Sequence, residues 1–272
     1  ARDPMTLSFV LFLFLAHLGI GIVFTLLLVN REAGVKFFRF NAGLAGTLLL
    51  VALAFRPDEV VLSSDAQGLA FLAVIVAAAA SLLYWATIGR VVYVLRTILL
   101  STAVAAGGIA LVAQALAISA GASTLAAALT VASFATSTAL LGGSCTAMSL
   151  GHWYLVLPKM PVAHLKSVVK FHIGTTAARI LVVSVAVWWA IVVAELPEPG
   201  FDRYIFSIDG VFFWQRILFG LLGPAVLAYM TWETAKIQAT QSATGILYVD
   251  FFTVMVGEVL AKYLLLATTV PV

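Results

Sequence analysis

The run MTLSFVLFLFLAHLGIGIVFTLLLV, residues 5–29, contains no Lys, Arg, Asp or Glu and indicates the fold class of this chain. A helix needs roughly 20 apolar residues to cross the hydrocarbon of a bilayer, which is about 30 Å thick. The run is too long for the core of a signal peptide, and no small-residue cleavage site ends it. It therefore predicts a first membrane-spanning helix that is not cleaved.

Comparable apolar runs recur along the chain and predict an all-α, polytopic membrane bundle of about eight transmembrane helices. The composition agrees, since 63% of the residues are hydrophobic, 10% are charged and the mean hydropathy is +1.11, whereas soluble domains carry about 25% charged residues. The alternation typical of outer-membrane barrel strands is missing. We expect one transmembrane domain over residues 1–272, with spans near residues 5–29, 40–55, 67–89, 92–119, 124–157, 168–194, 211–232 and 244–268.

Basic residues are divided unevenly between the two sets of loops, and this predicts the orientation. One set holds Arg31, Lys36, Arg39, Arg90, Arg96, Lys159, Lys166, Lys170 and Lys236, and the opposite set holds Arg2, Arg56 and Arg203. An excess of Lys and Arg marks the cytoplasmic side. We therefore expect a multi-pass protein of a bacterial-type inner (cytoplasmic) membrane with both termini outside. The same basic loop residues account for the pI of about 9.1. The pI therefore gives no reason to expect a nucleic-acid partner.

Several familiar site types are excluded or not favoured. The single cysteine, Cys145, excludes a disulfide within the chain and a cysteine-only metal or iron–sulfur site. The chain has no P-loop, dinucleotide-binding glycine motif, HExxH motif or nucleophile elbow. Because every predicted connection is short, a soluble catalytic module would have to be a separate polypeptide.

Two histidines stand out on the fifth and sixth predicted spans. His152 follows Cys145 and Ser149 at steps of four and three residues, and His172 shares a helical stripe with Arg179. We expect both imidazoles near the cytoplasmic face at similar depth. Such a pair would ligate the iron of one haem b or hydrogen-bond a quinone carbonyl. The alternative is a packing role, because stripes of small residues let membrane helices approach closely.

Intramembrane charges point to the sixth, seventh and eighth spans. Their estimated depths predict two ion pairs, Arg179–Asp250 and Arg216–Glu258, and the helical spacing predicts a third between Glu258 and Lys262. Charged groups inside a membrane are costly and usually face the bundle interior. We expect an outer cluster of Glu258, Arg216 and His17 that handles protons or a quinol, with helix locking as the alternative.

Two segments resemble the membrane-anchor subunits of the polysulfide and dimethyl sulfoxide reductase families. They are FVLFLFLAHLGIGIVFTLLL, residues 9–28, and VMVGEVLAKYLLL, residues 254–266. The resemblance implies a haem-free, quinol-reactive anchor that exchanges electrons with an iron–sulfur partner, with His17 and Glu258 as first site candidates. The segment GGSCTAMSLGHWYLVLPKMP, residues 142–161, has no counterpart there and leaves a separate, haem-bearing family open.

The leading hypothesis is a membrane-embedded electron-transfer subunit of a respiratory complex that interacts with quinone or quinol. Its partners would be the lipid bilayer and separate iron–sulfur or cytochrome subunits, and a haem b on His152 and His172 belongs to this hypothesis. The candidate cofactor-binding residues are His17, His152, His172, Arg179, Arg216, Asp250 and Glu258. The alternatives are a transporter or channel that uses the intramembrane charges and a purely structural anchor.

Overall fold

The computed structural model describes residues 7–56, 65–90, 93–157, 160–194 and 200–272. Within these residues every regular element is a helix, and eight helices are long and apolar enough to cross a membrane. The prediction of a bundle of about eight apolar helices is therefore confirmed. The orientation in the membrane stays a prediction.

The helices follow the predicted spans closely. The second is longer than predicted, because it begins at Gly34 rather than near residue 40. The seventh is one continuous rod of an α, a π and a second α segment. The spans are α1 (Leu7–Leu26), α2 (Gly34–Ala54), α3 (Ala66–Thr87), α4 (Tyr93–Ile118), α5 (Thr124–Val156), α6 (Ala163–Val192), α8–η2–α9 (Val211–Ile217, Leu218–Leu222, Gly223–Lys236) and α10 (Thr240–Thr268), with short η1 (Arg31–Ala33) and α7 (Phe201–Ile205) between them.

Local sequence explains several helix starts and the irregular seventh span. Asp65 and Ser123 are N-caps, because their side-chain oxygens accept hydrogen bonds from backbone N–H groups in the first turns of α3 and α5. The π segment η2 ends at Leu222, two residues before Pro224. Proline has no N–H to donate to the carbonyl four residues earlier, so the regular ladder is interrupted there. Such π bulges are frequent at functional sites.

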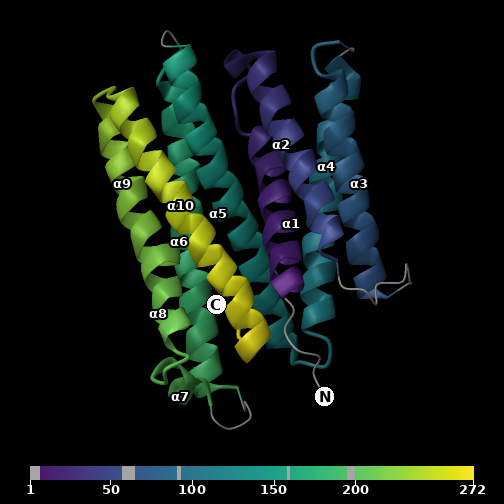
Figure 1. Ribbon diagram of the computed structural model, residues 1–272, viewed down its shortest axis with the longest axis vertical. Helices are drawn as coiled ribbons and strands as arrows, with labels where there is room; N and C mark the ends of the chain where they lie inside the picture. The colour runs from purple at the N-terminus through teal and green to yellow at the C-terminus, as the bar shows by residue number, and fades with distance from the viewer. Residues whose placement is uncertain (1–6, 57–64, 91–92, 158–159, 195–199) are drawn as a thin grey trace.

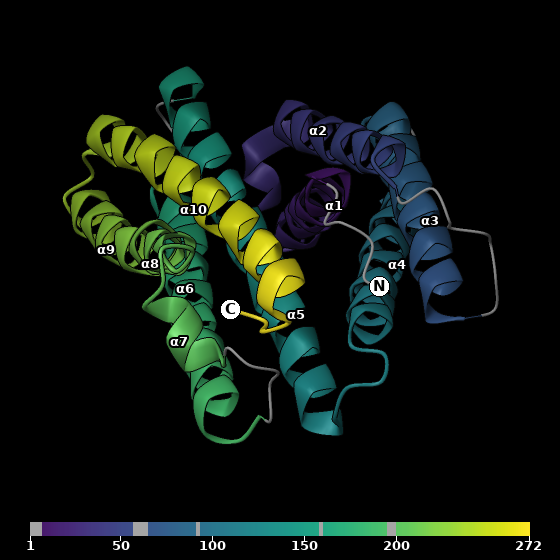
Figure 2. The ribbon, with the colours of Figure 1, turned by 60° about the horizontal axis from the view of Figure 1, so that its bottom comes forward.

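The bundle has two sides that meet at α1. Figure 2 shows α1 between α2–α4 on one side and α5–α10 on the other, and α1 is the most enclosed of the eight spans. Its glycine Gly21 lies directly against Gly142 of α5, and a Cβ at either position would collide with the backbone of the other helix. Small residues at this crossing let the two backbones touch.

The fifth span runs without a break through Gly142 and Gly143. It has 33 residues, which is roughly 50 Å at 1.5 Å per residue. This exceeds the hydrocarbon thickness of about 30 Å, so in a bilayer α5 would have to tilt or project past the hydrocarbon. Figure 1 shows α5 crossing the bundle obliquely beside α10.

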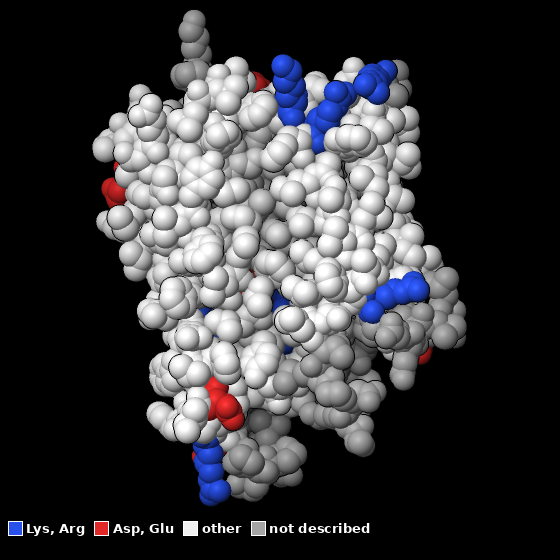
Figure 3. Space-filling model, in the orientation of Figure 1, with Lys and Arg blue, Asp and Glu red and all other residues white. Residues whose placement is uncertain are grey.

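The face of the bundle drawn in Figure 3 carries few charged side chains over its middle. On the face drawn in Figure 3, Lys and Arg side chains gather mainly at the upper end, and a broad belt of other residues separates them from the charges at the lower end. Large apolar side chains of the helices are exposed, among them Leu181, Trp188 and Phe252. An apolar belt is what lipid hydrocarbon covers in a helical membrane protein.

Candidate functional site

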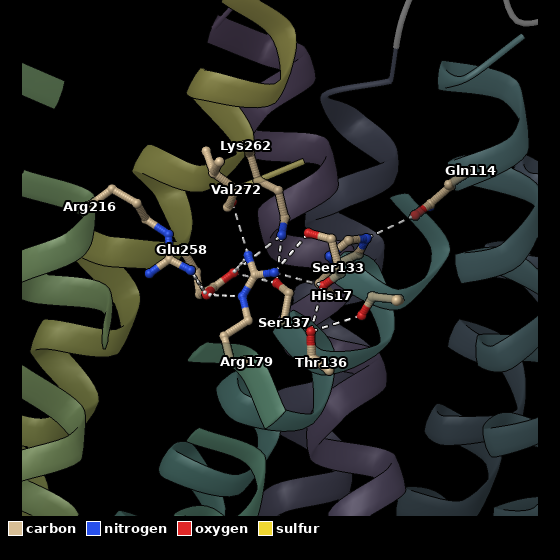
Figure 4. A network of polar contacts seen from close by, with 11 residues as sticks. His17, Gln114, Ser133, Thr136, Ser137, Arg179, Arg216, Glu258, Lys262 and Val272 are labelled. Carbon is tan, nitrogen blue, oxygen red and sulfur yellow. Dashed lines mark hydrogen bonds and ion pairs between the residues drawn. The ribbon is translucent and has the colours of Figure 1, made fainter. Parts of the chain in front are cut away.

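A cluster of charged side chains lies inside the bundle, around the carboxylate of Glu258. Glu258 and Lys262 come from α10, and they are one helical turn apart. Arg179 reaches them from α6 and Arg216 from α8. All four side chains are buried, with no more than 1% of any residue exposed. Figure 4 shows the three cationic side chains converging on Glu258, and we call these four residues the Glu258 cluster.

Arg179 binds the carboxylate of Glu258 with two parallel hydrogen bonds. Its Nε donates to Oε1 over 3.0 Å and its Nη2 donates to Oε2 over 3.2 Å. Its remaining nitrogen, Nη1, donates to the hydroxyl of Ser133 on α5 over 2.8 Å, and Nη2 also donates to the backbone oxygen of Val272 over 3.2 Å. Bidentate arginine–carboxylate pairs are strong and fix the relative orientation of both groups. Arg179 is thereby held between α5, α6 and α10.

Arg216 and Lys262 approach the same carboxylate from two other directions. Arg216 Nη2 lies 3.0 Å from Oε1, and Lys262 Nζ lies 3.4 Å from Oε2. The hydroxyl of Ser137 on α5 is 2.5 Å from both Oε2 and Lys262 Nζ, so it connects the two charges. The predicted pairs Arg216–Glu258 and Glu258–Lys262 are confirmed.

The Glu258 cluster contains more positive than negative charge. Counting side chains, three basic groups surround one carboxylate, and the oxygen of Val272 is a further acceptor for Arg179. Of the Arg216 guanidinium, Nε and Nη1 are buried and have no hydrogen-bond partner among the described residues. Arg216 Nη1 instead lies against Gly220 of η2, where a Cβ would collide with it. Buried charges are costly unless compensated, so this cluster favours an additional negative or electron-rich group.

His17 of α1 adjoins the Glu258 cluster but has no direct contact with Glu258. Its Nε2 is 3.2 Å from the side-chain oxygen of Gln114 on α4, and its Nδ1 has no partner among the described residues. Its ring meets the edge of Phe134, with centroids 4.5 Å apart, and Lys262 Nζ lies 5.4 Å from the centroid of the same ring. Phe134 therefore contacts both His17 and Lys262, in a site that both sides of the bundle help to form.

The predicted ion pair between Arg179 and Asp250 is wrong. Asp250 lies next to His172, with Oδ2 2.8 Å from Nε2, and both side chains are fully buried. The two atoms are within ion-pair distance but lack the angles of a hydrogen bond. The prediction was wrong because it assumed another register of α6 against α10. Arg179 of α6 lies level with Glu258 of α10, and His172, two turns earlier on α6, lies level with Asp250.

The two histidines proposed as haem ligands have different partners. His172 is fully buried beside Asp250. His152 is exposed, and its Nδ1 lies 2.9 Å from the hydroxyl of Tyr248 on α10. No group of three or more His, Cys, Asp or Glu side chains that could hold a metal ion occurs in the described parts of the chain. Haem ligation by His152 and His172 stays a prediction.

Some residues of the site were not singled out from the sequence. Ser133 and Ser137 bind Arg179, Glu258 and Lys262, and Gln114 binds His17. Two serines four residues apart in an apolar helix share one face, and polar groups in a span usually face the interior. The spacing of these two serines therefore indicated a polar face on α5. The residues singled out from the sequence belong instead to a neighbouring stripe of α5 that ends at His152.

No protein-family model matches the chain, and no curated protein matches it. The function is therefore inferred from the geometry of the site alone.

Proposed function

We propose that this chain is a membrane-embedded electron-transfer subunit of a respiratory complex, and that the Glu258 cluster binds the head group of a quinone or quinol. The surplus of basic over acidic side chains around Glu258 in the apolar core supports the proposal most directly. A quinone head group offers two oxygens that accept hydrogen bonds, and it is soluble in the bilayer.

Reduction of a quinone takes up two electrons and two protons and places negative charge on its oxygens before protonation. Fixed guanidinium and ammonium groups in a water-poor site stabilise such developing charge far better than they would in water. Arg179 and Arg216 are held by Glu258, so they need little reorganisation when the charge appears. Their role in the proposal is to bind the head group and to make its reduced form more stable.

Proton exchange in the proposal involves His17, because its Nδ1 has no partner among the described residues and imidazoles act as general acids and bases. Glu258 is bound by three cations and serves mainly to hold them together. The electrons would pass to or from a separate iron–sulfur or cytochrome subunit. In the proposed orientation the loops rich in Lys and Arg face the cytoplasm of a bacterial-type cell.

A binding experiment tests the proposal. The purified chain in lipid nanodiscs is titrated with a one-isoprene ubiquinone and a one-isoprene menaquinone, and binding is followed by calorimetry. We expect saturable binding of at least one of them, weakened at least tenfold by Arg216→Gln. The matched control is Arg90→Gln, which removes an exposed arginine. Absence of saturable binding to the folded wild-type chain would refute the proposal.

Transport of a small anion is the second candidate, because the same excess of positive charge would also attract an anionic solute. Reconstitution distinguishes the two functions. Uptake of an anion into proteoliposomes that Arg216→Gln abolishes, without quinone binding, would favour transport. Co-purification with redox subunits and quinone binding without flux would favour the electron-transfer subunit.

A further inference from the structure

A polar pocket of about 450 Å³ lies where the chain that leaves α1 meets the start of α6. We call it the α1–α6 pocket. It belongs to the end of the bundle where α1 ends and α2 begins, which is the upper end in Figure 1. Asn30, Arg31, His164 and Ser167 supply its polar side chains, and Leu27 and Leu28 are among its apolar ones.

Contacts between neighbouring elements hold the walls of the α1–α6 pocket in place. The carboxylate of Glu32 in η1 lies 2.6 Å from Nε2 of His164 in α6, so the two walls are joined directly. The indole N–H of Trp153 on α5 donates a hydrogen bond to the backbone oxygen of Ala33 over 3.0 Å, which ties η1 to a third element. The pocket is therefore formed before a ligand binds, and a ligand does not have to order it.

The α1–α6 pocket lies at the basic end of the bundle. Figure 3 shows Lys and Arg side chains gathering at this end on the face that it draws. The only acidic side chain known to contact a pocket residue, Glu32, is engaged by His164. A negatively charged group in the pocket would therefore lie in a positive field. The described loops and helix ends here contain the basic residues Arg31, Lys36, Arg39, Arg90, Arg96, Lys166, Lys170 and Lys236, and the acidic residues Glu32 and Glu233.

We infer that the α1–α6 pocket binds the head group of an anionic phospholipid at the membrane surface. Arg31 supplies positive charge, and the hydroxyl of Ser167 and the amide of Asn30 are hydrogen-bond donors for phosphate oxygens. Leu27 and Leu28 are 49% and 43% exposed and give the pocket an apolar edge for the first carbons of the acyl chains. Basic pockets between membrane helices are a known way of binding anionic lipid head groups.

Two features of the α1–α6 pocket favour this ligand over its chemical relatives. A soluble phosphate ester would use the polar donors but would leave the exposed leucines at the edge in water. A zwitterionic phospholipid would bring its own cationic group to the basic end of the bundle, where it would be repelled. The inference does not depend on the proposed quinone site, because the two sites share no residue.

Lipid binding to the purified full chain tests the inference. The chain in detergent is titrated with phosphatidylglycerol, with phosphatidylcholine of the same acyl chains or with glycerol 1-phosphate, and native mass spectrometry counts the bound molecules. We expect one phosphatidylglycerol to bind about tenfold more tightly than phosphatidylcholine. Arg31→Gln should weaken its binding about fivefold, and Ser167→Glu, which places a carboxylate in the pocket, about tenfold. The matched control is Arg90→Gln, an exposed arginine of the same end outside the pocket lining, which should change it less than about twofold.

Three results would overturn the inference. Equal binding of phosphatidylglycerol and phosphatidylcholine would show that the head group is not recognised. Equal weakening by Arg31→Gln and Arg90→Gln would assign the preference to the general field of the basic end. Binding of glycerol 1-phosphate as tight as that of phosphatidylglycerol would make the ligand a soluble phosphate ester. Arg31→Gln decides the test alone if Ser167→Glu does not fold, and quinone binding enters none of these outcomes.

Discussion

The first four spans have mean hydropathies of 1.6 to 2.5 and the last four of 1.6 to 1.8, and the two sets stabilise their interiors by different means. In the described parts of α1–α4 no Lys, Arg, Asp or Glu side chain is buried, and the buried polar residues there are neutral ones such as Asn41 and Gln114, with His17. The last four spans bury Arg179, Arg216, Asp250, Glu258 and Lys262. Hydrophobicity therefore identifies the spans in both halves of the molecule. Buried charged side chains occur only in the described parts of the last four spans, which contain most of the candidate site.

In the last four spans, which we call the charged half, buried side chains connect α6 with α10 at two depths, here called levels. His172 meets Asp250 at one level, and Arg179 meets Glu258 at the other. Both levels join α6 to α10, and the spacing of seven residues on α6 and eight on α10 keeps them in register. The two levels differ in charge, since the first contains one possible cation and one carboxylate whereas the second has three cations for one carboxylate. Only the second level has the excess that calls for an additional ligand.

Replacement of Glu258 should have the largest effect, because Glu258→Gln leaves three buried cations without their carboxylate. We expect the free energy of unfolding to fall by about 3–5 kcal/mol, the range for breaking a buried ion pair. Thermal unfolding in detergent measures the loss. The matched control is Glu233→Gln, which breaks an exposed pair with Lys236 and should cost about 0.5 kcal/mol or less. Equal stability of the two variants would show that the buried Glu258 cluster does not stabilise this half as described.

The crossing of α1 and α5 joins the two halves and should be the next most sensitive point. Gly142→Ala adds a methyl group where the backbone of Gly21 lies, and overpacking of this kind costs about 1–3 kcal/mol. We expect a lower unfolding temperature and reduced yield. Gly108→Ala, at an open position of α4, should leave both unchanged. If the two alanine variants behave alike, the close contact of α1 and α5 is not needed for the fold.

The level formed by His172 and Asp250 should show strong coupling in a double-mutant cycle. Asp250→Leu leaves His172 buried without its partner, which should cost about 2 kcal/mol, and His172→Leu should cost a similar amount. The double variant should cost less than the sum of the single variants by about 1 kcal/mol, as expected for residues in contact. Additive effects would show that the two side chains do not interact.

The neutral contact between His17 and Gln114 should contribute least to stability. Gln114→Leu removes one neutral hydrogen bond, which is worth about 1 kcal/mol. We expect a small decrease in the unfolding temperature, measured in the same detergent as for Glu258→Gln. A loss as large as that of Glu258→Gln would place an essential polar site in the first half as well.

The sequence predicted the spans well because length and apolarity define them directly. It predicted Glu258–Lys262 from helical spacing and Arg216–Glu258 from depth. It misplaced Arg179, because the pairing of residues on different helices depends on the register and tilt of each helix, and an error of two turns exchanges Asp250 for Glu258. The serines of α5 were missed for a related reason, since only the three-dimensional packing shows which of two adjacent polar stripes faces the charges.

Photolabelling tests most directly whether the charged half contains a quinone site. The purified chain in nanodiscs is irradiated with an azidoquinone, and labelled peptides are identified by mass spectrometry with and without excess unlabelled quinone. The proposed site predicts labels within residues 133–139 of α5 and 174–179 of α6 that unlabelled quinone prevents. Labels confined to α2–α4, or labels that unlabelled quinone does not prevent, would contradict it.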